Sequence, residues 1–491
     1  MAGVQSRCKV LDYWCSLCVT HTRNSEDTMT AKERIEGRRI GIVGMARSGV
    51  AAACLARRHG GLVFVSDSAS DDQLQASMKE LAAAGIEFET GGHSSSLLDV
   101  DYIVVSPGVP LEIDILKQAR ERGLPVFSEI ELASWVCPGK IVAITGSNGK
   151  TTTSVIVGEL LQASQKHVFV CGNIGLPFSE IVDMMDEQSI AVIEVSSFQL
   201  LTIEDFRPHL AAILNITPDH LDRHGSFADY REAKYRITEN QTADDYLVLS
   251  HDDDAISSSP PETLAITKYC SSDESKEAST AIRDKVLCLR QDDTYIDIMP
   301  IDDIQLPGRH NLQNIAFAIV LADILGVKTA TMSEVLRKFP GVEHRLEDAG
   351  SVAGVRFIND SKATNVESTC VALQAVSSDI YLIVGGRDKG SSYQPIVAAA
   401  SGKIKGIVAI GEAKEKIFDQ LGQSLSVEFA ASLQEAVTRC FSLASPGETV
   451  LLSPACASFD MFDNFEERGR IFKEAVKSLN NGKRKSETVS N

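Results

Sequence analysis

The 491-residue sequence has no apolar run of the roughly 20 residues that a helix needs to cross a lipid bilayer. It also lacks the apolar segment of a secretory signal peptide. Basic residues are in deficit, with 48 Lys and Arg against 67 Asp and Glu, and a net charge of −19 argues against nucleic acid as a partner. We therefore expect a cytoplasmic protein that does not insert into a membrane.

The eleven cysteines include no second CxxC pair at zinc spacing, so the lone pair Cys15 and Cys18 does not predict a metal site. Most of the others lie in apolar stretches, as Cys54 and Cys171 do. This pattern is typical of reduced, buried thiols in a cytoplasmic protein.

Residues 1–35 are polar and have no clear period, and Met29 offers a second start of translation. We expect this segment to be disordered or an artefact of the chosen start site, with an organelle transit segment as the alternative.

The rest of the chain predicts an α/β protein of three consecutive α/β domains, Rossmann-like at both ends with a central phosphate-loop ATPase. Continuous apolar runs that become polar only at their ends are typical of buried parallel strands. Residues 251–280 are rich in Asp, Ser and Pro and predict a surface excursion. The predicted boundaries are 1–35 for the extension, 36–128, 129–341 and 342–479 for the domains, and 480–491 for a solvated tail.

The segment VAITGSNGKTTT, residues 142–153, resembles a phosphate-binding loop between a strand at 141–145 and a helix at 152–161. Gly146 and Gly149 let the backbone approach a phosphate, and the helix N-terminus adds positive potential. Lys150 is expected to reach the terminal phosphates and Thr151 to hold Mg²⁺. An ordinary glycine turn is the alternative.

The turn after the first strand, residues 44–49, matches the dinucleotide pattern GxGxxG except that Ala46 replaces the middle glycine. Asp67 follows about twenty residues later, where a ribose-binding acid is expected. The turn fits any nucleoside diphosphate, so an NAD-dependent dehydrogenase stays open at this point. A second strand ends in Ser106, Pro107 and Gly108, which offers backbone N–H groups at the same sheet edge.

Glu194 stands at the end of an apolar strand, and His220 comes just after another. A buried acid is costly unless it meets a cation, and Mg²⁺ beside Lys150 and Thr151 would supply one. A helix cap or an ion pair is the alternative for Glu194.

Lys234 lies on the apolar stripe of a predicted helix, between Tyr230 and Ile237. A buried lysine has a lowered pKa, and its neutral amine can take up CO₂ to give an anionic carbamate that binds Mg²⁺. The alternative is a lysine whose stem lies on apolar surface while its ammonium reaches water. In a later helix, Asn311 and Asn314 are one turn apart and would either contact an adenine edge or cap the helix.

Several strings together are similar to the Mur ligases of peptidoglycan synthesis, in order and at suitable spacing from about residue 36 to 479. They are GSNGKTTT, GNIG (172–175), EVSSFQL (194–200), NITPDHLDRHG (215–225), YREAK (230–234), GRHNLQN (308–314), EHRLE (343–347) and SPACASFDMFDNFEERG (453–469). The strings NDSKATN (359–365) and SPACAS resemble the D-glutamate-adding branch of the family.

The resemblance implies a cytoplasmic, monomeric, ATP-dependent ligase of cell wall biogenesis, which also bears on cell shape and division. ATP would phosphorylate the carboxylate of UDP-N-acetylmuramoyl-L-alanine, and the amine of D-glutamate would attack the acyl phosphate. Such transfer between anions needs charge neutralisation and alignment, which two Mg²⁺ ions would provide. Alternatives are another Mur ligase, a folylpolyglutamate synthase-like amide ligase, or a nucleotide-dependent switch.

The resemblance also implies roles for individual residues. The catalytic set is Lys150, Asn173, Glu194, His220 and Lys234. The metal ligands are Thr151 and Glu194 for one ion, and His220 and carbamylated Lys234 for the second. The ATP site is Gly146, Ser147, Asn148, Gly149, Lys150, Thr151, Thr152, Asn311, Asn314, Arg345 and Asp360. The UDP-substrate site is Ala46, Arg47, Ser48, Asp67, Ser106, Gly108 and Ser196. The D-glutamate pocket is Lys362, Thr364, Lys389, Ser458 and Phe465.

Overall fold

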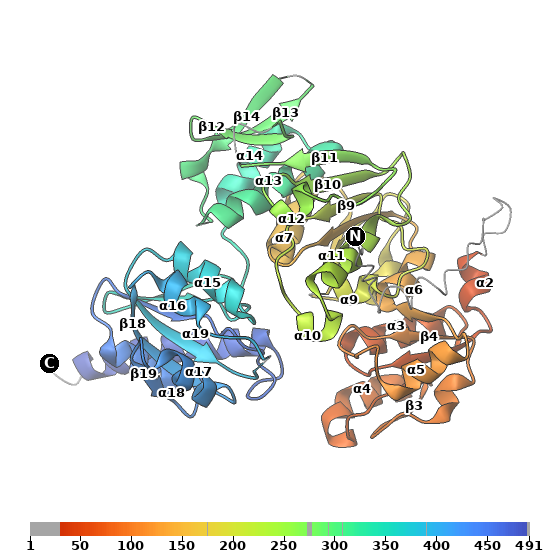
Figure 1. The fold of residues 1–491 in the computed structure, drawn as a ribbon, viewed down its shortest axis with the longest axis horizontal. Coiled ribbons are helices and arrows are strands. Elements are labelled where there is room, and N and C mark those ends of the chain that lie inside the picture. Colours follow the sequence, from red (N-terminus) through yellow and green to blue (C-terminus); the bar gives the residue numbers. More distant parts are fainter. Residues whose placement is uncertain are drawn as a thin grey trace, which may run out of the picture. The chain divides into compact units, whose positions relative to one another are not determined.

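The computed structural model describes residues 30–173, 175–272, 277–292, 294–306, 308–388 and 390–488. These residues form two compact units (Figure 1). Unit 1 comprises residues up to 304 together with 309–338, and unit 2 comprises 305–308 and the residues from 339 onward. Three sheets rich in parallel strands confirm the predicted α/β class. Among the described residues, no helix is both long and apolar enough to cross a membrane.

The first helix, α2 (Ala31–Ile35), lies inside the segment predicted to be disordered. Thr30 and Glu33 form a capping box, in which each side chain accepts the backbone N–H of the other residue. Ile35 is fully buried, and Arg34 pairs with Asp205 at 2.5 Å. The expectation of disorder is therefore wrong for residues 30–35, where the cap and one buried side chain hold a short helix. Residues 1–29 lie outside the described part of the chain.

The first sheet is entirely parallel, with the order β3-β2-β1-β4-β5. Its helices are α3 (Arg47–Arg58), α4 (Asp71–Ala83) and α5 (Asp114–Glu121). The order reverses at β1, and in open α/β sheets a ligand binds in the crevice beyond the carboxyl ends of the strands at such a point, here β1 and β4. The strands are β1 (Arg39–Val43), β2 (Leu62–Ser66), β3 (Glu87–Glu89), β4 (Tyr102–Val105) and β5 (Val126–Ser128).

The second sheet has nine strands in the order β14-β13-β12-β11-β10-β9-β6-β8-β7. The run from β7 to β12 is parallel, and β12, β13 and β14 pair antiparallel. The strands are β6 (Lys140–Thr145), β7 (Val168–Gly172), β8 (Ile190–Glu194), β9 (Leu210–Ile213), β10 (Tyr246–Ser250), β11 (Ile266–Cys270), β12 (Thr280–Arg283), β13 (Val286–Gln291) and β14 (Thr294–Pro300).

The helices of this part include α7 (Lys150–Ala163), which follows β6 and contacts α13 (Arg309–Ile324) and α14 (Thr329–Lys338). Shorter ones are α6 (Glu129–Val136), α8 (Phe178–Ile181), α9 (Ser197–Leu200), α10 (Leu221–His224), α11 (Phe227–Tyr235) and α12 (Asp254–Ser257).

The predicted surface excursion at 251–280 is only partly an excursion, because β11 pairs in parallel with β10 inside the sheet. Its residues are mostly half-buried rather than buried, so the strand lacks the continuous apolar run that marks its neighbours. This is why the sequence pattern did not reveal it.

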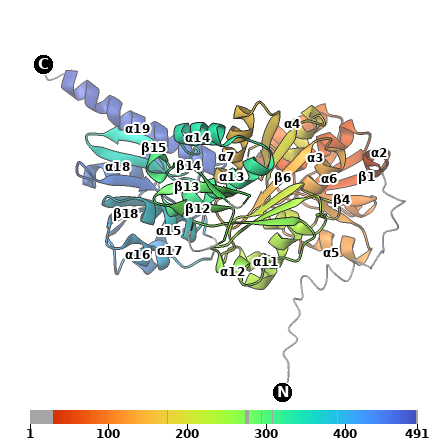
Figure 2. The same cartoon turned by 90° about the horizontal axis from the view of Figure 1, so that it is seen from above.

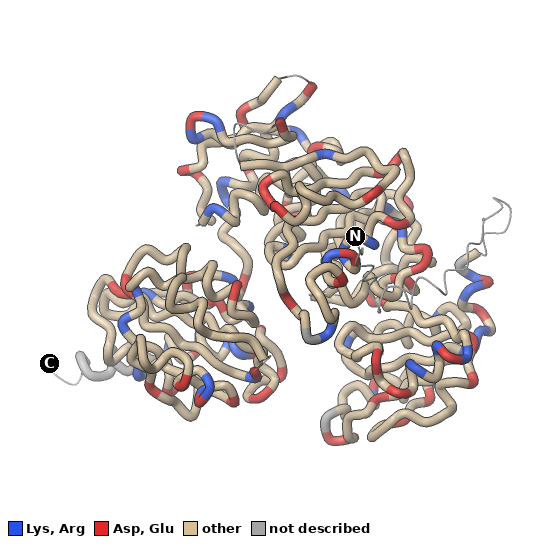
Figure 3. Tube along the Cα trace, viewed as in Figure 1, with Lys and Arg blue, Asp and Glu red and all other residues tan. Residues whose placement is uncertain are grey.

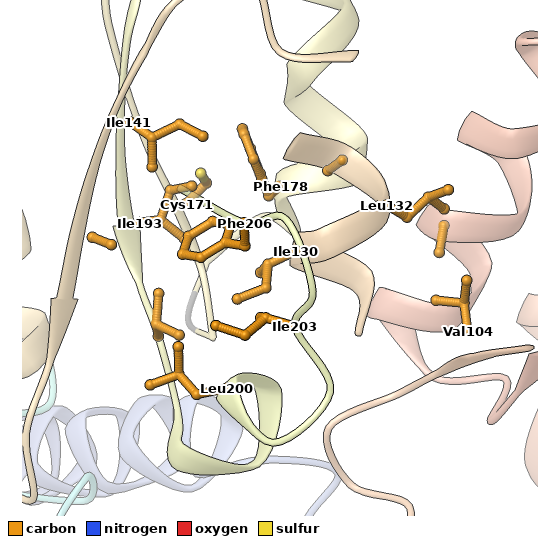
Figure 4. Close-up of a cluster of buried hydrophobic side chains, with 14 of the residues drawn as sticks. Val104, Ile130, Leu132, Ile141, Cys171, Phe178, Ile193, Leu200, Ile203 and Phe206 are labelled. Carbon is orange, nitrogen blue, oxygen red and sulfur yellow. The ribbon is translucent and has the colours of Figure 1, made fainter. Parts of the chain in front are cut away.

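A single hydrophobic cluster joins the first two sheets (Figure 4). It extends from Val104 on β4, through Ile130 and Leu132 on α6, to Ile193 on β8. All four side chains are at most 1% exposed. Since their apolar surfaces are removed from water together, the two sheets form one compact unit. The predicted boundary between residues 128 and 129 falls between β5 and α6 and stays a prediction.

Unit 2 is built on a six-stranded sheet with the order β15-β16-β20-β17-β18-β19, parallel except for the β15–β16 pair. The long helix α19 (Phe465–Thr488) continues past the predicted domain end at 479 (Figure 2). The strands are β15 (Glu347–Val352), β16 (Val355–Asn359), β17 (Ile380–Gly385), β18 (Ile404–Ile410), β19 (Val427–Phe429) and β20 (Thr449–Leu452). The other helices are α15 (Val366–Ala375), α16 (Pro395–Ala400), α17 (Lys414–Leu421) and α18 (Leu433–Leu443).

Acidic and basic residues are interspersed along the backbone of both units (Figure 3). An anionic ligand must therefore be bound by individual basic residues near the ends of particular strands.

Candidate active site

The phosphate-loop candidate connects β6 to α7 at the centre of the second sheet. Gly146 has φ of 151° and Gly149 has φ of 86°, so both occupy backbone conformations that favour glycine. A side chain at Gly149 would collide with the amide of Asn314, which is buried on α13. The chain thus turns tightly just before α7, whose N-terminal N–H groups are suited to bind an anion.

Lys150 folds over this loop. Its Nζ donates hydrogen bonds to the carbonyls of Gly146 at 2.8 Å and Ser147 at 2.9 Å. The ammonium is therefore held inside the curve of the loop, where a bound phosphate oxygen would compete with these carbonyls.

Thr151, Asn173 and Glu194 meet at the ends of α7, β7 and β8. The Thr151 hydroxyl donates to Glu194 Oε2 at 2.6 Å, and Asn173 Nδ2 donates to Glu194 Oε1 at 3.2 Å. Glu194 is only 3% exposed. A hydroxyl and a carboxylate side by side are the hard oxygen donors that Mg²⁺ prefers, so these residues fit a magnesium ion.

Lys234, on α11, lies against the same loop. It is 1% exposed, which confirms the predicted burial and excludes the alternative in which its ammonium reaches water. Its Nζ donates to the Gly146 carbonyl at 2.9 Å and lies 4.6 Å from the centre of the Tyr230 ring. Burial, and secondarily the charge of Lys150, hold the pKa of Lys234 well below its usual value.

Ser147 and Tyr230 fasten α11 to the loop. The Ser147 hydroxyl donates to the Thr217 carbonyl and accepts the Thr217 N–H, both at 3.0 Å. The Tyr230 hydroxyl, 3.0 Å from Ser147 Oγ, is therefore the donor of that pair. This network places the buried amine of Lys234 at the loop and was not predicted as a network from the sequence.

His220 lies in the segment between β9 and α11. Its φ of 52° is unusual for a residue other than glycine, and its side chain is 33% exposed. Its Nε2 is 3.8 Å from Asp219 Oδ2, and its ring meets Phe198 edge to face at 5.1 Å.

Asn215 is a loop residue that the sequence reasoning did not single out. The Asn148 N–H donates to Asn215 Oδ1 at 2.8 Å, and Asn215 Nδ2 donates back to the Asn148 carbonyl at 3.0 Å. Its position directly after the run that ends at β9 was the available signal, since ligand-facing polar residues follow buried parallel strands. On the other side of the loop, Asn314 Nδ2 donates to Asn311 Oδ1 at 3.1 Å, and both are 4% exposed.

Most of the residues predicted for the UDP substrate follow the carboxyl ends of β1, β2 and β4. Ser106 donates from its hydroxyl to the Gly44 carbonyl at 3.2 Å, and a side chain at Gly49 would collide with that carbonyl. This close approach explains the glycine at position 49. Ala46 precedes α3, with Arg47 and Gly108 exposed, Ser48 half-exposed and Ser196 capping α9.

Asp67 binds its own domain through both carboxylate oxygens. Oδ2 accepts the Met45 N–H at 2.6 Å, and Oδ1 accepts the Ala69 N–H at 2.8 Å. The acid thus fixes the glycine turn after β1, while its assignment to a ribose stays a prediction.

In unit 2, Asp360 follows β16 and is 4% exposed. Its Oδ2 accepts the Ser453 hydroxyl at 2.7 Å and its Oδ1 accepts the Leu346 N–H at 3.2 Å. Burial raises its pKa to about 7, against the opposing effects of Ser453 and the Arg345 charge.

The residues predicted for D-glutamate are placed around the ends of β16 and β20. Lys362 Nζ lies 5.6 Å from the centre of the Phe465 ring, and Ser458 is buried while Thr364 is half-buried. Lys389 lies outside the described residues. Arg468 was not predicted, but it is fully buried and donates to the Ser361 carbonyl at 2.7 Å and the Cys456 carbonyl at 3.2 Å.

Three segments of the chain match known domains. Residues 38–128 match the Mur ligase MurD-like N-terminal domain, residues 144–322 the Mur ligase middle domain, and residues 344–456 the Mur ligase glutamate ligase domain. Each match falls on one of the three sheets.

Curated relatives extend the match over nearly the whole chain. The UDP-N-acetylmuramoylalanine–D-glutamate ligase of Acidobacterium capsulatum is 43% identical over 445 residues, which is 90% of this chain and 96% of the relative. The ligase of the same name from Chloroherpeton thalassium is 42% identical, covering 91% of this chain and 99% of the relative.

Solved structures agree on the fold. A UDP-N-acetylmuramate-alanine ligase from Thermotoga maritima is 21% identical, with a TM-score of 0.58 over 90% of this chain and 99% of that one. A MurF ligase from the same organism, in complex with ADP, is 16% identical, with a TM-score of 0.58 over 85% of this chain and 95% of that one.

Proposed function

The chain belongs to the Mur ligase family, and from this premise we propose that it is an ATP-dependent ligase that joins D-glutamate to UDP-N-acetylmuramoyl-L-alanine. The observation that carries the proposal is the convergence of Lys150 and buried Lys234 on the carbonyl of Gly146, with the Thr151–Glu194 pair at the first turn of the helix that follows. Relatives that bear the name of this ligase at 42–43% identity support the choice of substrates.

The reaction begins when a carboxylate oxygen of the L-alanyl residue attacks the γ-phosphorus of ATP, and ADP departs. The amine of D-glutamate, after losing a proton, attacks the acyl carbon. The resulting tetrahedral centre collapses with loss of inorganic phosphate and leaves an amide. Both reactants of the first step are anions, so charge neutralisation and alignment contribute most of the rate.

Each residue of the site has a separate role in this step. The backbone N–H groups from Gly149 to Thr152 would hold the phosphates, since those of Ser147 and Asn148 bind Asn215. Lys150 would exchange its carbonyl partners for the β- and γ-phosphate oxygens. Asn173 orients Glu194 through its amide. Asn311 and Asn314 would hold the adenine side of the nucleotide. Arg345 and Asp360 are the residues proposed for its phosphate and its ribose.

Mg²⁺ would neutralise the transferring phosphoryl group. Thr151 and Glu194 would hold one ion, and His220 and Lys234 a second. Lys234 suits this role as a carbamate, because its low pKa supplies the neutral amine that adds CO₂. The carbamate keeps one N–H, which can retain the bond to the Gly146 carbonyl.

The remaining predicted residues hold the two substrates. The crevice at β1 and β4, with Ala46, Arg47, Ser48, Asp67, Ser106 and Gly108, would bind the uridine diphosphate, and Ser196 would lie nearer the reacting end. Lys362, Thr364, Lys389, Ser458 and Phe465 would bind D-glutamate, whose two carboxylates suit lysine and hydroxyl donors. The product is a precursor of peptidoglycan, and we propose a cytoplasmic monomer.

Phosphate release tests the proposal directly. The protein is incubated with ATP, Mg²⁺ and UDP-N-acetylmuramoyl-L-alanine, and a panel of amino acids is added separately. D-glutamate should trigger phosphate release, whereas L-glutamate, L-alanine and diaminopimelate should not. Equal turnover with diaminopimelate would assign the chain to another branch, and release that is independent of any amine would refute ligase activity.

A further inference from the structure

We propose that Arg223 is a positioning residue that couples the UDP-substrate loop at 106–110 to His220. The inference rests on the proposed function, in which this loop binds the UDP substrate and His220 helps to bind a metal ion. Arg223 belongs to α10, which Figure 1 draws beside the first sheet, and no role was predicted for it from the sequence.

The side chain of Arg223 joins two parts of unit 1. Its guanidinium donates to the Val109 carbonyl at 3.1 Å, directly after Ser106, Pro107 and Gly108. The same guanidinium lies 3.8 Å from the centre of the Phe198 ring. Stacking of a planar cation on a ring fixes its orientation, and a lysine would not reproduce that geometry.

The main chain of Arg223 is hydrogen-bonded to His220. The Arg223 N–H donates to the His220 carbonyl at 3.0 Å, as does the N–H of His224. His220 has a φ of 52°, a conformation that costs free energy for a residue with a side chain and persists only where its surroundings enforce it. These two bonds are part of that restraint.

Phe198 completes the connection. Its ring meets His220 edge to face at 5.1 Å and stacks with His224 at 4.9 Å. His224 is in turn fixed, because it is 3% exposed and its Nε2 lies 2.9 Å from the Ser197 hydroxyl. Phe198 therefore has a rigid support, and the His220 imidazole packs against it.

A displacement of the substrate loop is thus transmitted to His220 by a short path. Val109 moves Arg223, and Arg223 acts on His220 through its own backbone and through the Phe198 ring. Binding of the UDP substrate and correct placement of His220 then favour each other, which is a reciprocal coupling between two sites.

The test compares Arg223→Ala, Arg223→Lys and Phe198→Leu with wild type. Arg223→Ala and Phe198→Leu should each raise the KM for UDP-N-acetylmuramoyl-L-alanine and the Mg²⁺ concentration for half-maximal rate by about tenfold. The KM values for D-glutamate and ATP should change less than twofold. Arg223→Lys should be intermediate, because it keeps a donor for Val109 but loses the stacked plane.

Arg283→Ala is the matched control, since Arg283 also lies over a ring, 4.1 Å from the centre of Tyr295 on the antiparallel part of the second sheet. It should leave all these constants unchanged. In the double variant Arg223→Ala/Phe198→Leu, the effects should not add, because both substitutions break one path.

Three results would overturn the inference: unchanged constants in Arg223→Ala, additive effects in the double variant, or a uniform loss in every constant together with a lower melting temperature. If the wild type shows no D-glutamate-dependent phosphate release, the proposed function itself fails. If the wild type turns over and the Arg223 variants keep its KM values, only the inference about Arg223 fails.

Discussion

The Nζ of Lys234 donates a hydrogen bond of 2.9 Å to the carbonyl of Gly146, 88 positions earlier in the sequence. That carbonyl also accepts from Lys150 at 2.8 Å. Two lysine side chains thus donate to one backbone oxygen. Lys150 is half-buried and Lys234 is buried. Burial, and secondarily the charge of Lys150, lower the pKa of Lys234, which supports the proposal that the Lys234 amine is carbamylated.

Lys234→Ala should abolish most turnover, because it removes a proposed metal ligand, while ATP binding is largely kept. Acetate or formate can occupy the vacated space as a carboxylate, so either should partly restore turnover in the alanine variant and leave wild type unchanged. Chloride at equal ionic strength is the control. A Lys234→Gln variant with wild-type activity would show that the site does not require carbamate charge.

Lys150→Ala should lower kcat by about 10²-fold or more, because the developing charge on the transferred phosphoryl group loses its cation. The melting temperature should stay close to that of wild type, because water can replace the half-buried ammonium at the carbonyls of Gly146 and Ser147. Lys140→Ala is the control, because Lys140 is exposed at the start of β6, the strand that precedes the loop. Activity within a few-fold of wild type would remove the loop from the chemistry.

Asn215→Ala should raise the KM for ATP by roughly tenfold, since losing two hydrogen bonds to the Asn148 backbone frees the phosphate loop at a cost of about 1–3 kcal/mol. Steady-state kinetics with varied ATP measures this. Asn240→Ala removes an amide that donates to the carbonyls of Glu204 and Phe206, away from the loop, and should leave the KM for ATP unchanged. Equal effects of the two substitutions would contradict a specific role for Asn215.

Asp360→Asn should stabilise the protein relative to wild type at alkaline pH. The folded pKa of Asp360 is about 7 and its ordinary value is 3.8, so the folded state binds more protons between these values. Its contribution to stability is therefore present below pH 3.8 and is lost as pH rises through 7. Asparagine stays neutral, and the advantage of the variant should grow with pH to about 4 kcal/mol by pH 8.

The measurement is the difference in melting temperature between Asp360→Asn and wild type from pH 5 to 8, without ligands. Asp379→Asn, whose carboxylate forms a half-exposed pair with Lys405, controls for the loss of a charge. A difference for Asp360→Asn that does not vary with pH would contradict the raised pKa.

Local and periodic signals were sufficient to predict part of the molecule from its sequence. The continuous apolar runs of β6, β8 and β9 are typical of strands that are covered on both faces of a sheet. Gly146 and Gly149 permit backbone angles that are unfavourable for other residues. The family, the α/β class and the ligase chemistry were predicted correctly for this reason, since the motifs are contiguous strings. The capping box at Thr30 was equally local and was overlooked.

Contacts between residues far apart in the sequence became apparent only in the folded chain. The reciprocal pairing of Asn148 with Asn215, the fastening of Tyr230 to Ser147 and the contact of Arg223 with Val109 each join different elements. Such contacts depend on strand order and on the angle at which helices lie over the sheet, and neither leaves a pattern in the sequence. The low pKa of Lys234 has the same origin: the helix stripe predicted burial, but the folded chain supplied the loop, the ring and the second lysine around it.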